Sequence, residues 1–173
     1  MGGAGRVRED ARSRGMAPPL SAPDPRRTFG ALALLGVGLM AAVDEVVFHQ
    51  LLRWHHFYDL STPAVGIVSD GLLHAAELVA LVTGGFLIAD LLRRRAFVPA
   101  WAWAGFFVGA GGFQTFDGLV DHKLLRVHQV RYGVELLPYD LAWIGAGLAL
   151  LAIGAALWMR ARAQSPGVGQ VGA

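Results

Sequence analysis

Hydrophobic and polar residues alternate in long blocks along the chain rather than at short intervals. Four apolar runs cover residues 29–48, 71–89, 96–116 and 141–159, and polar stretches separate them. Each run has about the 20 residues that a helix needs to cross a hydrocarbon layer about 30 Å thick. Because a spanning segment must satisfy its backbone hydrogen bonds internally, each run is expected to be a helix. The pattern predicts an all-α, polytopic membrane protein with four transmembrane helices.

The composition agrees with a membrane protein and removes several kinds of site. Of the 173 residues, 54% are hydrophobic and only 16% are charged, which is unusual for a soluble domain of this size. The lipid bilayer is therefore the expected partner, and nucleic acid is not expected. The chain has no cysteine, which excludes disulfides, thiolate-bound metals and iron–sulfur clusters.

The basic residues indicate how the chain lies in the membrane. Eleven of the fifteen Lys and Arg residues fall in the N-terminal segment, in the connection around residues 93–95, or after the fourth run. Since basic residues favour the cytoplasmic side, both termini are expected in the cytoplasm and the loops around 49–69 and 121–138 outside. The expected location is the plasma (inner) membrane, which the chain crosses several times.

The limits of the membrane domain follow from the same blocks. Residues 1–28 are polar and rich in Arg and Pro, and are expected to form a disordered cytoplasmic tail. Residues 29–162 are the four-helix membrane domain, and 163–173 form a second disordered tail. Alternatively, the string RRTFGALALLG at 26–36 resembles a twin-arginine export signal whose apolar run is removed. The internal repeat described next argues against that alternative.

A polar dodecamer occurs twice in the chain. DEVVFHQLLRWH at 44–55 and DGLVDHKLLRVH at 117–128 share seven of twelve residues and lie 73 positions apart. The second and fourth apolar runs also correspond, more weakly, with an offset of 70 that aligns Asp70 with Asp140. We therefore expect two tandem helical hairpins, about 29–95 and 96–162, packed as a four-helix bundle with a pseudo-twofold axis through its centre.

Histidines and carboxylates gather near the outward ends of the predicted helices. Charged groups at membrane depth are costly unless paired, so this cluster indicates a functional site. Imidazole and carboxylate without sulfur suit Zn, Cu(II), Fe or Mn, and we expect one or two such transition-metal ions, with His49 and His122 as equivalent ligands. The candidate ligands are His49, His55, His56, His74, His122, His128, Asp44, Asp70, Asp117 and Asp121.

Helical spacing limits how these residues are combined. Glu45 and His49 lie one turn apart on one helix face, which suits a ligand and the carboxylate that orients it. Eleven residues of straight helix would instead separate Asp44 from His55 by roughly 16 Å. Either the outer segment bends back over the helix ends, or Asp44 and His55 belong to different shells of the site.

Other interpretations of the same residues remain open. His55 and His56 also suit an aromatic belt at the membrane surface. Asp44, Asp117 and Asp140 also suit helix caps or structural ion pairs with Arg53 and Arg126. The metal centre has three rivals as a function: a haem-binding cytochrome, a proton-coupled transporter or pH sensor, and a structural partner subunit. Whether the protein is an enzyme is open, and a homo-oligomer is one of the expected assemblies.

The strings FHQLLRWHH, SDGLLHAAE, DGLVDHKLLRVHQVR and YDL together resemble a bacterial family of predicted membrane proteins, domain of unknown function 2243. The resemblance covers roughly residues 30–160. It implies partners among respiratory-chain or metal-handling membrane proteins, through an association with terminal-oxidase assembly. Two positions depart from the family pattern: Glu45 stands where Gly is frequent, and Gln129 where a second His is common. The residues that the resemblance marks as important are His49, His55, His56, Asp70, His74, Asp121, His122, His128 and Asp140.

Overall fold

Helices and their connecting turns make up residues 22–164, which are the residues that the computed structural model describes. The long helices are α2 (Pro25–Val43), α3 (Pro63–Arg93), α4 (Pro99–Phe116) and α5 (Leu137–Gln164). Two π-helical segments, η1 (Asp44–Leu51) and η2 (Asp117–Leu125), continue α2 and α4. The four helices coincide with the four apolar runs, so the all-α class predicted from the sequence is confirmed.

Helices α2 and α5 each run past a predicted limit of the membrane domain. Helix α2 begins at Pro25 rather than at residue 29, because Asp24 accepts a hydrogen bond from the backbone N–H of Arg27 at 2.9 Å and proline suits the first helical position. At the other end, α5 continues to Gln164 instead of ending at residue 162. The rest of the two predicted tails, 1–21 and 165–173, lies outside the described residues.

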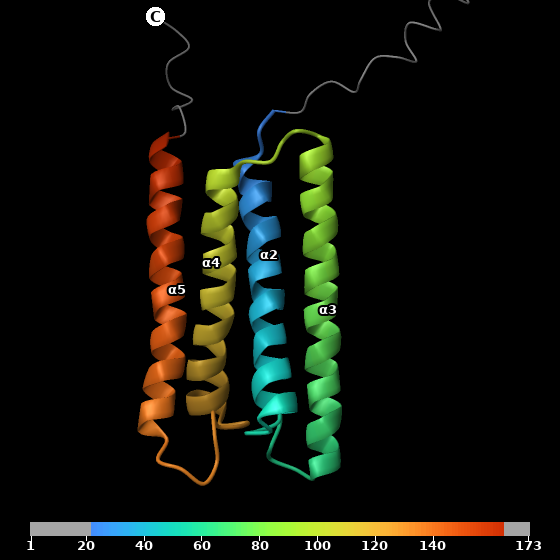
Figure 1. The fold of residues 1–173 in the computed structure, drawn as a ribbon, viewed down its shortest axis with the longest axis vertical. Helices are drawn as coiled ribbons and strands as arrows, with labels where there is room; N and C mark the ends of the chain where they lie inside the picture. The colour runs from blue at the N-terminus through green and yellow to red at the C-terminus, as the bar shows by residue number, and fades with distance from the viewer. Residues whose placement is uncertain (1–21, 165–173) are drawn as a thin grey trace, which may run out of the picture.

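The four helices stand side by side in one row, in the order α5, α4, α2, α3 (Figure 1). Helices α2 and α4 form the centre of the row, and the hairpin partners α2–α3 and α4–α5 pack together as the repeat predicts. Within residues 22–164, α3 and α5 do not contact each other, so the expected closed bundle is not formed. Hydrocarbon is as apolar as a leucine side chain, and in that solvent the outer helices gain little by closing the row.

The central pair, α2 and α4, approach each other closely at two glycines of α4. A Cβ atom at Gly105 would overlap the carbonyl oxygen of Phe29, and one at Gly109 would overlap that of Ala33. The spacing of these glycines places both on one face of α4, the small-residue arrangement that lets membrane helices pack backbone to backbone. The middle of the row is therefore held by close backbone contact rather than by large side chains.

Three helical stretches are long and apolar enough to cross a membrane: Pro25–Leu51, Pro63–Arg93 and Leu137–Gln164. Helix α4 is shorter and less apolar, since it contains four weakly apolar glycines and Gln114. The side chain of Gln114 is buried and donates to the carbonyl oxygen of Trp143. Within the described part of the chain, the structure supports three candidate spans and does not confirm the four that the sequence predicts.

After η1 and after η2 the chain reverses its direction in the same way. Arg53 and Arg126 both adopt left-handed backbone conformations, with φ of 53° and 54°. The N–H of the residue after each Arg donates to the carbonyl oxygen six residues earlier, at 2.9 Å and 3.0 Å. The two loops then meet, where the N–H of Asp59 donates to the carbonyl oxygen of Val127 at 2.9 Å. Both loops thus return over the helix ends.

Candidate metal centre

The reversal after η1 brings His55 back beside His49, whose ring centroid lies only 4.4 Å from that of His55. The same turn after η2 places His128 beside His122, with centroids 4.6 Å apart. Of the two arrangements that the spacing left open, the chain therefore adopts the one in which the outer segment bends back. A straight helix would have kept Asp44 and His55 apart, and the left-handed turn at Arg53 removes that restriction.

His55 and His128 are each held by a backbone carbonyl of the other hairpin. The Nδ1 atom of His55 lies 2.9 Å from the carbonyl oxygen of Val130, and that of His128 lies 2.9 Å from the carbonyl oxygen of Phe57. Because a carbonyl oxygen only accepts, Nδ1 carries a proton in both rings, and in the neutral form of each ring Nε2 carries the lone pair. Both Nε2 atoms are buried without a hydrogen-bond partner, which is how a protein presents histidine to a metal.

The four buried imidazoles follow one another in a row. Adjacent centroids in the order His49, His55, His128, His122 are 4.4, 4.7 and 4.6 Å apart. Alternate rings are 6.1 Å apart for His49 and His128, and 6.0 Å for His55 and His122. The distances between centroids are nearly the same in both directions along the row, so the two halves of the row have similar ring spacing.

One aspartate lies beside each half of the row. In the first half, Asp44 Oδ2 is 3.7 Å from His49 Nε2. In the second, Asp117 Oδ2 is 3.1 Å from His122 Nε2, and its Oδ1 is 3.3 Å from His128 Nε2. These oxygen and nitrogen atoms have the ligand chemistry of a transition-metal site.

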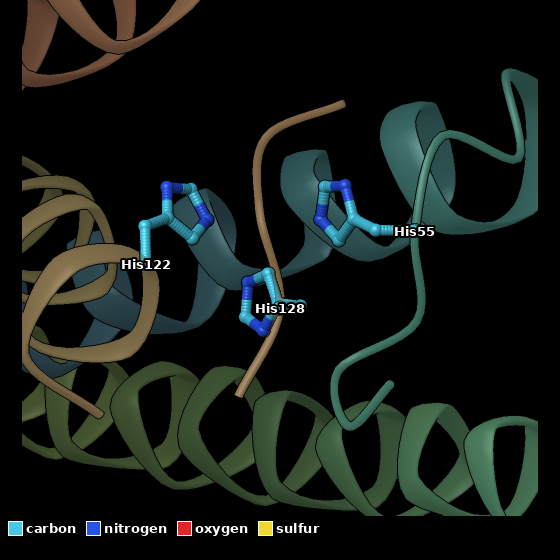
Figure 2. A group of neighbouring side chains, drawn as sticks. All are labelled: His55, His122 and His128. Atoms are coloured by element: carbon cyan, nitrogen blue, oxygen red, sulfur yellow. The ribbon is translucent and has the colours of Figure 1, made fainter. Parts of the chain in front are cut away.

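The buried residues form three groups that could each hold a metal ion. Within each group, the ligand atoms lie within 4.8 Å of one another. Figure 2 shows one of them, in which the rings converge from three segments: the loop after η1, η2 itself, and the loop after η2. The three groups, in the described part of the chain, are His55 with His122 and His128; Asp44 with His49 and His55; and Glu45 with His49 and Asp70.

Asp70, at the start of α3, fixes the first loop. Its carboxylate accepts from the backbone N–H of Phe57 at 2.7 Å and lies 2.6 Å from Nδ1 of His56 and 3.1 Å from Nδ1 of His49. His49 Nδ1 is also 2.9 Å from Glu45 Oε2. These contacts hold the His49 ring with Nε2 turned toward Asp44, so Asp70 orients a ligand and anchors the loop that carries His55.

Three of the predicted ligands lie outside the central cluster. The side chain of His74 is 51% exposed and pairs with Glu77 at 2.6 Å. His56 sits at the edge, one-third exposed, and contacts Asp70. Asp121 belongs to none of the three groups formed by the described residues, although its carbonyl oxygen accepts from the turn after η2. Helical spacing alone placed these residues near the site without showing which way they face.

The proposed pairing of Asp44 and Asp117 with Arg53 and Arg126 is not seen among the described residues. The remaining outer aspartate, Asp140, pairs instead with Lys123 at 2.6 Å. The two buried aspartates therefore face imidazoles and not guanidinium groups, and the simple ion-pair interpretation of these residues does not apply.

Trp143 is a contributor that sequence reasoning missed. Its indole N–H donates to Asp117 Oδ2 at 2.8 Å, and its ring lies 5.7 Å from that of His122. A tryptophan within an apolar run gives no sign of this role, since its polar atom is a single N–H. The carbonyl groups of Phe57 and Val130 were missed for a similar reason, because every residue carries a carbonyl.

The cluster contains four buried carboxyl groups without a basic partner in the described part of the protein. Asp44, Glu45, Asp70 and Asp117 are at most 2% exposed, and none of them forms an ion pair with a described Lys or Arg. Burial lowers the pKa of His55, outside the helices, to about 2, and the neighbouring His128 and His49 act in the same direction. This imidazole is therefore neutral at physiological pH, and its lone pair is free without loss of a proton.

A polar cavity of about 450 Å³ reaches the cluster from one side. It lies between η1, the following loop and α3, next to His49 and Asp70, and Arg53 stands in its wall. A second cavity of about 430 Å³ adjoins Glu45 and His74. Both belong to the first hairpin, so open space on this side extends as far as His49, whose own side chain is 0% exposed.

A row of long apolar helices with a buried polar cluster at one end defines a helical membrane protein. The chain belongs to a family described as predicted membrane protein, DUF2243, whose model matches residues 31–161. This confirms the resemblance noted in the sequence and covers all four helices of the structure. No curated protein and no solved structure matches the chain.

Proposed function

We propose that this protein binds transition-metal ions in the buried His and Asp cluster and serves in metal handling within the membrane. One observation carries the proposal: His55 and His128 donate from Nδ1 to carbonyl oxygens and turn buried Nε2 atoms that have no hydrogen-bond partner toward the same space, with Asp117 Oδ1 3.3 Å from His128 Nε2. Leaving such atoms without a partner costs free energy that a bound ion would recover. Structural histidines in a core normally have both ring nitrogens satisfied.

In this proposal all four helices span the membrane, with both termini in the cytoplasm. The short α4 is enclosed between α2 and α5, where neighbouring helices rather than lipid cover much of its surface. The last turns of α3 and α5, which carry Arg93 and Arg162, lie at the end of the row opposite the segments η1 and η2 that follow α2 and α4 (Figure 1). The positive-inside rule then places the metal cluster at the outer face of the plasma membrane.

The proposal also includes an origin by duplication of one helical hairpin. The π-helical segments begin at Asp44 and Asp117, 73 positions apart. The left-handed arginines and the carbonyl bonds of His55 and His128 recur at the same offset. These matches support the repeat because backbone turns and cross-hairpin contacts are not selected by hydrophobicity alone.

Zn, Cu(II), Fe and Mn all accept a ligand set of imidazole and carboxylate, so each remains a candidate. Haem has less support as a cofactor. The rings of His55 and His128 are stacked with an interplanar angle of 7° and centroids 4.7 Å apart, which leaves no room for a porphyrin between them. The cavity beside His49 favours metal handling, since it lets an ion enter from the surface for transfer to a respiratory-chain or metal-handling partner.

Metal analysis of the purified protein tests this function. The full chain, purified in detergent with an affinity tag that contains no histidine, should hold at least one transition-metal ion per chain by mass spectrometry. His55→Ala combined with His128→Ala should remove it. His74→Ala is the matched control, because this exposed imidazole lies outside the cluster, and it should keep the metal. A metal-free wild type, or a Soret absorption band, would refute the proposal.

A further inference from the structure

We infer that the cluster holds two metal ions in two half-sites, one open to exchange and the other enclosed; this inference rests on the proposed function. Each half-site offers two imidazoles and one carboxylate. The first consists of Asp44, His49 and His55, whose ligand atoms lie within 4.8 Å of one another. The second consists of Asp117, His122 and His128, in which the two carboxylate oxygens lie 3.1 and 3.3 Å from the two Nε2 atoms. Two histidines and one carboxylate form a metal-binding set that leaves coordination positions free for water or a further ligand.

The order of the rings along this row, which bends at each inner ring because alternate centroids are only 6.0–6.1 Å apart, gives the two ions different ligands. His49 and His122 stand at opposite ends of the row, with the stacked pair of His55 and His128 between them. Metal–imidazole bonds are about 2.0–2.1 Å long, so each ion must lie close to its own ligands. Asp44 approaches one end of the row and Asp117 the other, so each end has its own carboxylate.

Buried carboxyl groups also border the row. Asp44, Glu45, Asp70 and Asp117 are at most 2% exposed, and no described Lys or Arg pairs with them. Carboxylates in such places are paired or coordinate metals, so these groups favour bound cations beside the row.

The surroundings of the half-sites differ because the hairpins have diverged. On the first side, a cavity of about 450 Å³ borders His49 and Asp70, and Glu45 adds a buried carboxylate whose Oε2 lies 2.9 Å from His49 Nδ1. On the second side, the buried ring of Trp143 packs against His122 and donates to Asp117. The first ion therefore exchanges with solvent through the cavity, whereas the second is retained behind Trp143.

Loading with cobalt tests both parts of the inference in the unmodified protein. The metal-free full chain in detergent is incubated with Co²⁺, desalted and analysed for cobalt, and two ions per chain are expected. On addition of EDTA, cobalt should leave in two phases of equal amplitude, with rates that differ by at least about tenfold. One ion per chain, or two ions that leave in a single phase, would overturn the inference while leaving the proposed function intact. No bound cobalt would refute the proposed function itself.

Single variants assign the two phases to the half-sites. His49→Ala should abolish the fast phase and keep the slow one, and His122→Ala should do the reverse. His74→Ala should retain both phases at wild-type amplitude. If either variant fails to fold, as judged by size-exclusion chromatography and helical circular dichroism, the biphasic release of the wild type still decides the inference. Loss of the same phase in His49→Ala and His122→Ala would contradict two separate half-sites.

Discussion

The Nδ1 atom of His55 lies 2.9 Å from the carbonyl oxygen of Val130, 75 residues later in the chain. This bond joins the loop of the first hairpin to the loop of the second, and it fixes the tautomer of a ring that is only 4% exposed. His49, His122, His128 and Asp44 surround the same imidazole. A histidine in this position has a defined charge and a defined direction for its lone pair.

The first prediction concerns pH. Burial holds the pKa of His55 at about 2 in the folded protein, against 6.5 when unfolded, so below about pH 6.5 the unfolded chain binds a proton that the folded chain does not. Stability of the metal-free protein is therefore full above that pH and falls on acidification, by up to about 1.4 kcal/mol per pH unit from this group. The thermal midpoint, followed by tryptophan fluorescence between about pH 7 and about pH 5, should fall more steeply in the wild type than in His55→Gln. Equal slopes would contradict a buried, neutral His55.

The second prediction concerns the carboxylate that anchors the first loop. Asp70→Asn keeps one acceptor oxygen where the aspartate serves the Phe57 N–H and two histidines, so folding should be weakened by about 2 kcal/mol. Metal affinity should fall about tenfold, because His49 loses its orientation. Asp140→Asn is the matched control at the corresponding position of the second hairpin, where only a partly exposed pair with Lys123 is lost, and should cost less than about 1 kcal/mol. Thermal denaturation and metal titration measure both effects, and equal losses in the two variants would argue against an anchoring role.

The third prediction concerns the tryptophan over the second half-site. Trp143→Phe keeps most of the ring but removes the N–H that donates to Asp117 at 2.8 Å. The slow phase of cobalt release should accelerate by about tenfold, while the fast phase stays unchanged. Trp103→Phe, at an exposed position on α4, should release cobalt as the wild type does. An unchanged slow phase in Trp143→Phe would show that this indole does not retain the ion.

The fourth prediction concerns the centre of the helix row. Gly109→Ala places a methyl group against the carbonyl oxygen of Ala33, and α2 and α4 must separate to admit it. We expect a loss of about 1–3 kcal/mol, measured as a lower thermal midpoint in detergent. Gly112→Ala lies on the same helix with no atom within 4 Å of the added methyl, so it should be neutral or slightly stabilising. Similar midpoints for the two variants would mean that α2 and α4 are not held by this contact.

The site was predictable in its residue types more than in its geometry. Asp44, His49, His55 and their counterparts were found because they repeat and because polar residues stand out in an apolar chain. His74 was expected beside them, yet it faces outward and pairs with Glu77, since a helical position gives a level along the axis without fixing the direction of the side chain. Trp143 was missed because hydrogen bonding by one indole N–H leaves no pattern in the sequence.

The sequence by itself determined the helices, their approximate limits and the pairing into two hairpins. The reason is that a hydrophobic block of this length forms a helix through interactions between residues that are close in the sequence. Only the tertiary structure decided that the helices stand in a row and that both loops return over their ends. Left-handed turns at Arg53 and Arg126 bring together side chains that a straight helix would keep apart. Those turns depend on contacts between the hairpins, such as the bonds of His55 and His128 to opposite carbonyls, which no local pattern contains.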